Sequence, residues 1–401
     1  MGFWSNWRWR LSWYYVDAFE KELDEFLCAV PNLSSYEVRE RVLRFMKRDF
    51  VRFSVYLEWK FKGYAQLKKS NRRELYRNAD LIRADFQTFC ETAGIESTKP
   101  AAVVQGLMEY LSPQNHFLYQ ESSAFFGLLK NPQQEKLVGD CNQICSLYVA
   151  LSTRYFLPTE WRIHLYDEHV ALVFDGQELE ATNGTMNQLG TGGKVLPIES
   201  LVAVNVLDIS EKNRRKFPII PERFLQSAAL VEALSPENPL AQKNMRVALH
   251  NMGLDLAKNH KFELAEQYFS RLQDKKLLEN LYAQAVHFYI ESSHYSKAEQ
   301  WAQKSARESL RLLVWNKRGS EALKQRKYTN AKRYFEKAQQ PENVQIVLET
   351  EMFDWYERVK NLTKLKDLKA QKSTIKKIYA RAKEVHHEGM IDWCKNVLEQ
   401  I

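Results

Sequence analysis

The sequence predicts an α+β protein in three parts: a helical N-terminal region over residues 1–100, a small α+β core over 101–225, and an all-α region of helical repeats with basic C-terminal helices over 226–401. Three observations predict this organisation. Apolar residues recur every three or four positions in the first part and again after about residue 240, which is the period of a helix. In the core the period changes to two, as in strands, and alanines spaced 33 residues apart mark an internal repeat in the last part.

Composition and charge limit the class of protein. The chain has 401 residues, enough for two or three domains, and 45% of them are hydrophobic, as in an ordinary globular protein. Its 58 basic and 50 acidic residues give a net charge of +8, which permits an anionic partner without requiring one. The five cysteines are an odd number scattered along the chain, and neither a long apolar run nor a secretory leader is evident. We therefore expect a cytoplasmic protein.

Helices are expected through the first part, with two breaks. The segment "VPNLSSYEVRE" interrupts the helical period after Val30, and a new helix should begin near Ser34 or Ser35, because serine is a favoured N-cap. A second turn is expected at "GIESTKP", residues 94–100. The region is therefore predicted to be a set of helices joined by short turns.

The strands of the predicted core lie between Glu160 and about Asp208. They are expected where residues alternate, or where β-branched residues cluster between glycine-containing turns: "WRIHLY", "HVALVF", "QELEAT" and "LVAVNVL". No other part of the chain carries a convincing strand pattern. All the strands of the protein are therefore expected in this segment.

Asp175 and Gly176 form a strong two-residue hairpin signal, which fixes the register of the strands on either side. Counting outward from the turn gives these opposite pairs: Phe174 and Gln177, Val173 and Glu178, Leu172 and Leu179, Ala171 and Glu180, His169 and Thr182. In this register His169 and Glu180 are diagonal neighbours on one face, whereas Glu178 lies one pair further away. Glu180 is therefore the carboxylate that we expect to hold the His169 imidazole.

Cys141, at the start of a predicted buried helix, is the candidate nucleophile. Asp140 is a favourable N-cap, and it would place Cys141 in the first turn, where unpaired N–H groups and the helix dipole stabilise a thiolate. The residues that follow are apolar nearly all round, so the helix should be buried with its mouth at a cleft. Thiolate catalysis also needs a histidine held by a third group, and we assign these roles to His169 and Glu180.

Two other interpretations of Cys141 stay open. The thiol could be the structural remnant of an inactive enzyme, or a metal ligand together with Cys145, His164 and His169. The metal set is disfavoured because the two cysteines have a helical spacing, and because His164, five residues from His169, should face the opposite side of a regular strand. Cys145 is expected to be a buried packing thiol, and His164 to be exposed or a hydrogen-bonded structural residue.

Three motifs follow one another over roughly residues 110–210: "GDCNQI", "HVALV" and "EATNG". Their order and their helix and strand context resemble the transglutaminase-like superfamily, which has Gly-x-Cys, a histidine strand and often Asp-Pro-Thr at these places. The resemblance implies a papain-like core in which Cys141, His169 and Glu180 form a catalytic triad. Two positions depart from the family pattern, since Asn142 replaces the usual Trp and Glu180 replaces Asp.

The last part of the chain repeats every 33 residues. The segments "FELAEQYFSRL", "YSKAEQWAQKS" and "YTNAKRYFEKA" each carry an aromatic residue three positions before an alanine, namely Ala265, Ala298 and Ala331. Twelve residues before these alanines stand Gly253, Val286 and Gly319. The pattern resembles tetratricopeptide repeats over roughly residues 242–345, in which such small residues let paired helices approach closely. The period of 33 rather than 34 and the missing middle glycine are departures, and a generic helical bundle is the alternative.

Two further segments bear on partners. The N-terminal stretch "MGFWSNWRWRLSWYY" concentrates tryptophan and arginine, as interfacial membrane helices do, but a helix docking on its own protein has the same composition, and membrane contact is the less favoured interpretation. Residues 358–383 hold ten basic residues and one acidic residue around an apolar stripe. Without a known nucleic-acid motif, this basic segment is interpreted as a solvated end cap of the repeats, and we do not expect nucleic-acid binding.

The triad and the repeats together predict a cysteine-dependent amide hydrolase or acyltransferase, that is, a transglutaminase-like protease or peptidase. Its substrate would be a protein or peptide recruited by the repeats, and no cofactor or metal ion is expected. The alternative is an inactive transglutaminase-like scaffold that serves as an adaptor between proteins.

Overall fold

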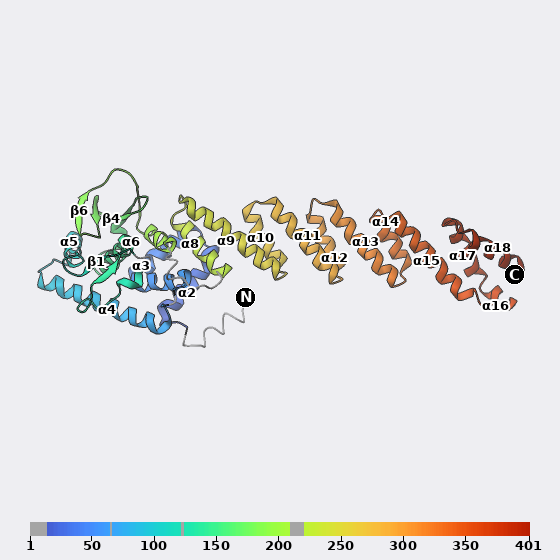
Figure 1. Cartoon of the computed structure of the whole chain (residues 1–401), viewed down its shortest axis with the longest axis horizontal. Coiled ribbons are helices and arrows are strands. Elements are labelled where there is room, and N and C mark those ends of the chain that lie inside the picture. The colour runs from blue at the N-terminus through green and yellow to red at the C-terminus, as the bar shows by residue number, and fades with distance from the viewer. Residues whose placement is uncertain (1–13, 65, 122–123, 209–219) are drawn as a thin grey trace. The chain divides into compact units, whose positions relative to one another are not determined.

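The computed structural model of the chain describes residues 14–64, 66–121, 124–208 and 220–401 (Figure 1). Contacts divide the chain into two compact units, unit 1 from Met1 to Met252 and unit 2 from Gly253 to Ile401. Unit 1 combines helices with a small antiparallel sheet and unit 2 is helical, so the predicted α+β class is confirmed at this level.

The N-terminal tryptophans whose pattern is typical of membrane contact lie outside the described residues: Trp4, Trp7, Trp9 and Trp13. Among the residues that are described, no helix has both the length and the apolar character needed to cross a bilayer.

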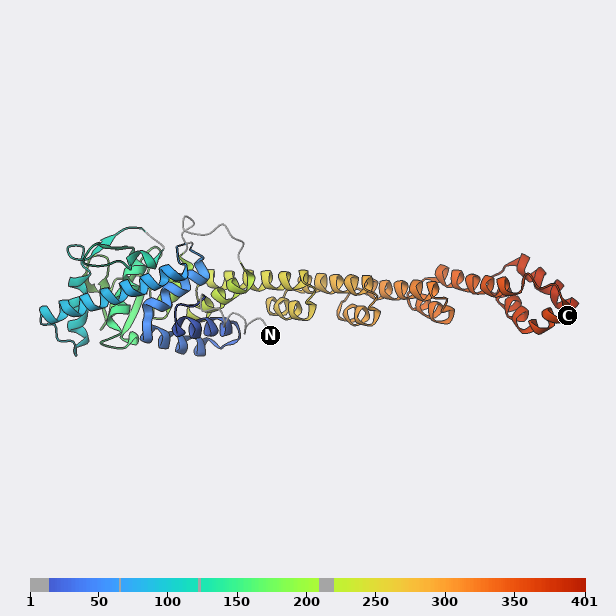
Figure 2. The same cartoon turned by 90° about the horizontal axis from the view of Figure 1, so that it is seen from below.

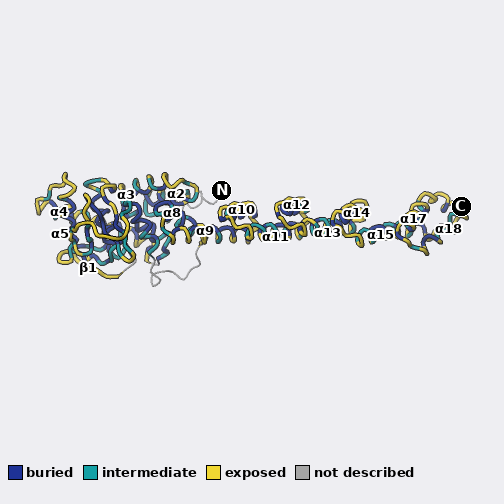
Figure 3. The backbone as a smooth tube through the Cα atoms, turned by 90° about the horizontal axis from the view of Figure 1, so that it is seen from above, coloured by how far each residue is buried: buried dark blue, intermediate teal, exposed yellow. Residues whose placement is uncertain are grey.

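The helices of unit 1 begin close to where the sequence predicts. Ser34 caps α3 (Ser35–Leu57), because its hydroxyl accepts the Glu37 N–H while the Glu37 carboxylate accepts the Ser34 N–H. The buried stretches of the chain gather inside the unit (Figure 3). Its helices are α2 (Ala18–Ala29), η1 (Val30–Asn32), α3 (Ser35–Leu57), η2 (Glu58–Lys62), α4 (Lys69–Thr92), α5 (Pro100–Tyr110), η3 (Phe125–Leu128), α6 (Cys141–Ser152), η4 (Pro158–Glu160), α7 (Ser200–Leu207) and α8 (Pro221–Leu234), and α9 (Pro239–Lys258) runs across the unit boundary.

Buried ion pairs join the N-terminal helices of unit 1. Arg72 of α4 donates to Glu20 of α2 at 2.7 Å, and both side chains are almost completely buried. On η2, the Glu58 carboxylate accepts the N–H groups of Phe125 and Phe126 at 2.8 and 3.2 Å. A buried carboxylate is tolerated only when it is paired and hydrogen-bonded in this way. Glu58 thereby fixes η3, which packs against the strand that leads to Cys141.

The main sheet has five antiparallel strands in the order β6-β5-β4-β3-β7. Their bounds are β3 (Trp161–Leu165), β4 (Val170–Phe174), β5 (Gln177–Glu180), β6 (Thr185–Gln188) and β7 (Lys194–Pro197). Two predictions of strand content are wrong. The "LVAVNVL" segment forms α7 instead of a strand, since a short apolar run fits a buried helix as well as a buried strand. A separate parallel pair, β1 (Phe117–Tyr119) and β2 (Leu137–Gly139), lies outside the segment where all strands were expected.

Unit 2 is built from consecutive helices that pack on their neighbours, such as α11 on α12 and α13 on α14 (Figure 2). One turn recurs with the sequence period: His260, Ser293 and Arg326, each 33 residues after the last, have positive φ of 57°, 61° and 57°. In each turn the next residue's N–H bonds back to the preceding helix, as helix C-termini commonly do. The helices are α10 (Phe262–Leu272), α11 (Lys275–Glu291), α12 (Tyr295–Lys304), α13 (Glu308–Lys324), α14 (Tyr328–Lys337), α15 (Pro341–Val359), α16 (Leu365–Ala370), α17 (Lys372–Glu384) and α18 (Glu388–Gln400).

Small residues make the close helix contacts in unit 2. Ala265, Ala298 and Ala331 have no exposed surface. A Cβ added at Gly253 would lie 2.4 Å from the Phe269 ring, and one added at Gly319 would lie 2.8 Å from the Phe335 ring. The positions singled out by the 33-residue pattern therefore lie at helix contacts.

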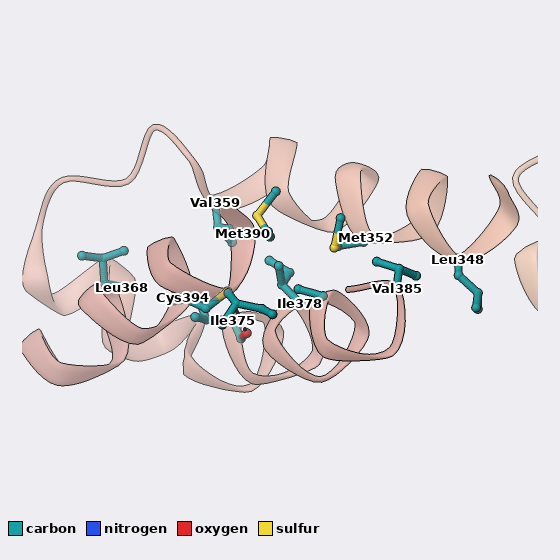
Figure 4. Packing of buried hydrophobic residues seen from close by; sticks show 11 residues of the cluster. Leu348, Met352, Val359, Leu368, Ile375, Ile378, Val385, Met390 and Cys394 are labelled. Carbon is teal, nitrogen blue, oxygen red and sulfur yellow. Dashed lines mark hydrogen bonds between the residues drawn. The ribbon is translucent and has the colours of Figure 1, made fainter. Parts of the chain in front are cut away.

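The apolar residues of the basic C-terminal segment, residues 358–383, belong to a buried cluster. Ile375 and Ile378 of α17 pack with Met352 of α15 and Cys394 of α18, and all four are fully buried (Figure 4). Of the predicted apolar stripe, Leu365 is the exception, since 49% of it is exposed. The lysines between the buried positions face solvent, as on an amphipathic helix.

Candidate active site

Cys141 is the first residue of α6. The Asp140 carboxylate accepts the Gln143 N–H at 3.4 Å, and the Gln143 side chain accepts the Asp140 N–H at 3.1 Å, which confirms the predicted N-cap. From Asn142 to Ser152 the helix is buried, whereas Cys141 is partly exposed. The Cys141 thiol therefore lies at the surface end of a buried helix, beside unpaired N–H groups and the positive end of the dipole.

The hairpin that carries the predicted base has the predicted register. Leu172 pairs with Leu179 and Phe174 with Gln177 across the turn. Asp175 and Gly176 have φ of 48° and 76°, the left-handed conformation that this two-residue turn requires. The ladder ends at the Leu172–Leu179 pair, and β5 ends at Glu180.

His169 and Glu180 are in direct contact, with 2.6 Å between His169 Nε2 and Glu180 Oε2. The other carboxylate oxygen accepts the hydroxyl and the N–H of Thr182 at 2.6 and 3.3 Å, which fixes the carboxylate plane. Burial alone would raise the pKa of Glu180, but hydrogen bonds from His169 and Thr182 lower it below its usual range. Glu180 is therefore an ionised acceptor.

His169 also bonds Cys141. That hydrogen bond is the largest cause of a rise in the pKa of His169 to about 10, followed by the bond to Glu180, while partial burial acts in the opposite direction. The ring nitrogen that contacts Glu180 is Nε2. The structure thus brings together the three residues that the sequence singled out.

Cys145 and His164 are not part of this cluster. Cys145 lies one turn deeper on α6 without exposed surface, and burial raises its thiol pKa well above the usual value. His164 is also buried, and its ring nitrogens contact Glu178 and the Gly192 carbonyl. No group of three or more His, Cys, Asp or Glu side chains in the described parts of the chain is arranged to hold a metal ion.

The predicted orientation of His164 is wrong. His164 pairs with Ala171 on β4, so its side chain lies on the same face of the sheet as those of Ala171 and His169. Residues 166–169 turn the chain between β3 and β4, and alternation along one strand cannot be counted through a turn. Of the two expected environments for His164, the hydrogen-bonded one is confirmed.

The sequence pattern does not predict the contacts of two residues near the site, Tyr119 and Asn142. Tyr119 pairs with Gly139, two residues before Cys141, and is about half exposed. Its pKa is raised by desolvation and then by the charges of Cys141 and Asp140, so its hydroxyl stays protonated beside the mouth of α6. Asn142, where the resembled family has Trp, is buried and donates to Asp208 at 3.0 Å, which ties α6 to the end of α7. Neither contact has a local sequence signal, because each joins segments far apart in the chain.

Comparisons with known proteins do not assign the chain to a family. No family model matches it, and no curated protein does. Among solved structures it is similar to a crystal structure of menin, described as revealing the binding site for Mixed Lineage Leukemia (MLL) protein, with 13% identity and a TM-score of 0.31 over 92% of this chain and 88% of menin. A TM-score of 0.31 does not establish a common fold, and the function is therefore argued from the site alone.

Proposed function

We propose that the protein is a cysteine-dependent amide hydrolase or acyltransferase with a transglutaminase-like core. Cys141 is the nucleophile, His169 the proton carrier and Glu180 the residue that orients His169. The observation that carries the proposal is that one imidazole joins the other two residues: His169 has a hydrogen bond with the Cys141 side chain, and its Nε2 lies 2.6 Å from the Glu180 carboxylate. A nucleophile, a base and an orienting acid in this order form the arrangement that activates a thiol.

In the first half-reaction the Cys141 thiolate attacks the amide carbonyl carbon, and the carbonyl electron pair moves to oxygen. In this step the N–H of Cys141, in the first turn of α6, stabilises that oxyanion. With a pKa of about 10, His169 is an imidazolium at neutral pH and can give its proton to the leaving amine as the C–N bond breaks. The product is a thioester on Cys141.

The second half-reaction needs His169 as a base. Because the bond to Cys141 is the largest cause of the raised pKa of His169, acylation removes that cause when the sulfur becomes part of the thioester. The His169 pKa then falls, and the imidazole can take a proton from water in hydrolysis or from an amine in transfer. Attack of either nucleophile on the thioester carbonyl releases the acyl group and restores the thiol.

Alkylation of the five cysteines tests this proposal without knowledge of the substrate. In the whole protein near neutral pH, Cys141 should react with iodoacetamide faster than the other four, and His169→Ala should slow it by about tenfold or more. Mass-spectrometric mapping gives each rate. Exposed Cys28 is the control, since His169→Ala should not change its rate. If Cys141 reacted no faster than Cys28, the nucleophile would be excluded and the adaptor function would be favoured.

For unit 2 we propose tetratricopeptide-type repeats that recruit the protein or peptide substrate. Support comes from the joint recurrence of a 33-residue spacing in the buried alanines and in the left-handed turns. Each helix pair in such an array buries its apolar face only on its neighbours.

Ala298→Asp tests the repeat register. It would place an unpaired carboxylate at a fully buried helix contact and should destabilise unit 2 by roughly 3 kcal/mol. Thermal unfolding of the whole chain followed by circular dichroism measures the loss. Ala370→Asp, at an exposed position on α16, is the matched control. Equal melting curves for the two variants would contradict the register.

A further inference from the structure

A second cluster of polar side chains lies beside the candidate triad on the same sheet. Glu178 of β5 accepts the Tyr166 hydroxyl at 2.7 Å and lies 2.5 Å from Nδ1 of His164. The Nε2 atom of His164 lies 2.7 Å from the carbonyl oxygen of Gly192, in the loop between β6 and β7. The proposed mechanism uses none of these groups.

The hydrogen bonds of this cluster assign two of its groups. A carbonyl oxygen only accepts, so Nε2 of His164 carries the hydrogen in the bond to Gly192. Burial raises the pKa of Glu178, but hydrogen bonds from Tyr166 and His164 outweigh it and leave the pKa below its usual range. Glu178 is therefore a carboxylate that contacts Nδ1 of His164 at 2.5 Å. Because both ring nitrogens of the buried His164 have polar partners, His164 holds the Glu178 carboxylate in place. Glu178 in turn holds the Tyr166 hydroxyl.

Tyr166 connects this anchor to the triad. Its ring centroid lies 4.2 Å from that of His164 and 6.2 Å from that of His169, to which it is nearly parallel at 26°. The Tyr166 N–H also donates to the His169 carbonyl at 2.9 Å and closes the turn between β3 and β4. Burial and the bond to Glu178 raise the pKa of Tyr166 to about 12, so its hydroxyl stays a donor at neutral pH. A displacement of Tyr166 would therefore also move His169.

Glycines let the β6–β7 loop pack directly on Tyr166. A Cβ added at Gly190 would lie 2.4 Å from the Tyr166 hydroxyl oxygen, too close to be accommodated without a shift. At Gly193 it would lie 3.0 Å from both His164 and Tyr166 and 2.7 Å from the Leu165 carbonyl oxygen. The loop thus confines the Tyr166 side chain at both Gly190 and Gly193.

We propose that Tyr166 is a positioning residue for His169, anchored through its hydroxyl by the Glu178–His164 pair and confined by the glycine loop. The anchored ring and the closed turn hold the His169 imidazole in the plane that lets it contact Glu180 and Cys141 together. The effect of Tyr166 on the reactivity of Cys141 rests on the proposed function, whereas its role in positioning the His169 ring does not.

Tyr166→Phe is the direct test, because it keeps the ring and removes only the anchoring hydroxyl. Two readouts are compared in the whole protein: the titration midpoint of the His169 ring by nuclear magnetic resonance, and the pH profile of Cys141 alkylation. We expect the His169 midpoint to fall by about half a pH unit and alkylation at neutral pH to slow about threefold, the size of one lost hydrogen bond. Tyr110→Phe is the control, since it removes a comparable bond from a buried tyrosine to Asp85 at 2.8 Å, and it should change neither readout.

Gly190→Ala, in the β6–β7 loop, is a second test of the role of Tyr166. Its methyl group would displace the Tyr166 hydroxyl and should lower the His169 midpoint as Tyr166→Phe does, whereas Gly127→Ala, where a Cβ meets only an ordinary contact at 3.6 Å, should not. An unchanged His169 midpoint in both Tyr166→Phe and Gly190→Ala would overturn the proposal, as would an equal shift in Tyr110→Phe. If Cys141 proved unreactive while both variants still lowered the His169 midpoint, the proposed function would fail and the positioning role would stand.

Discussion

Two histidine–glutamate pairs on one small sheet have nearly the same contact distance and different surroundings. His169 and Glu180 are 2.6 Å apart, with 36% of the histidine side chain exposed. His164 and Glu178 are 2.5 Å apart, with 2% of the histidine exposed. The second partner of each histidine separates the pairs, because His169 bonds the Cys141 thiol whereas Nε2 of His164 donates to a backbone carbonyl. A histidine–glutamate pair can therefore have a catalytic or a structural role, depending on the second partner of the histidine.

The largest expected difference between the pairs is in stability. His164→Ala should lower the free energy of unfolding by about 3 kcal/mol, because it leaves the Glu178 carboxylate largely buried without its partner. His169→Ala should cost less than about 1 kcal/mol, since that pair is more exposed. Denaturant unfolding followed by tryptophan fluorescence measures both. Equal losses would show that burial does not distinguish the two pairs.

A smaller difference is expected in reactivity. Glu180→Gln should slow alkylation of Cys141 about tenfold near neutral pH, because the imidazolium loses the carboxylate that it contacts at 2.6 Å. Glu178→Gln should slow it less than about threefold, since Glu178 acts on His169 only through Tyr166. Both rates come from labelling followed by mass spectrometry. A larger effect of Glu178→Gln would mean that the roles of the two carboxylates are reversed.

The smallest expected difference is in how stability depends on pH. The pKa of His169 is raised from 6.5 to about 10 in the folded protein, so its contribution is complete below pH 6.5 and is lost as the pH rises through about 10. The pKa of Glu178 is lowered from 4.5, so its contribution is present above pH 4.5 and is lost as the pH falls further. The destabilisation by His169→Gln should therefore fade at alkaline pH, and that by Glu178→Gln at acid pH. Unfolding curves at several pH values measure both, and parallel profiles would contradict the assignment.

Local turn and cap chemistry explains which parts of the site could be predicted. The Asp175–Gly176 turn sets the register of β4 and β5 within a few residues, and Asp140 starts α6 by bonding only three positions away. The contact of His169 with Glu180 follows from that register. These features depend on neighbours in the sequence, so their pattern is visible in the sequence.

Features that depend on distant segments could not be predicted. The three-residue strands β1 and β2 pair only because the chain returns after η3, and neither has an alternating pattern of its own. The second histidine–glutamate pair was missed because the face of His164 depends on a turn after β3. The sequence predicts a strand where α7 forms, because an apolar run of this length is buried in either form.

The anchoring of α6 also has a consequence for the order of folding. Asn142 bonds Asp208, 66 residues further along, and Glu58 holds the N–H of Phe125 across 67 residues. Closing such long loops costs more chain entropy than forming the turns of unit 2, which join helices adjacent in sequence. When the full chain refolds, helix pairs of unit 2 can therefore form before the Asn142–Asp208 bond that ties the thiol-bearing helix α6 to the end of α7.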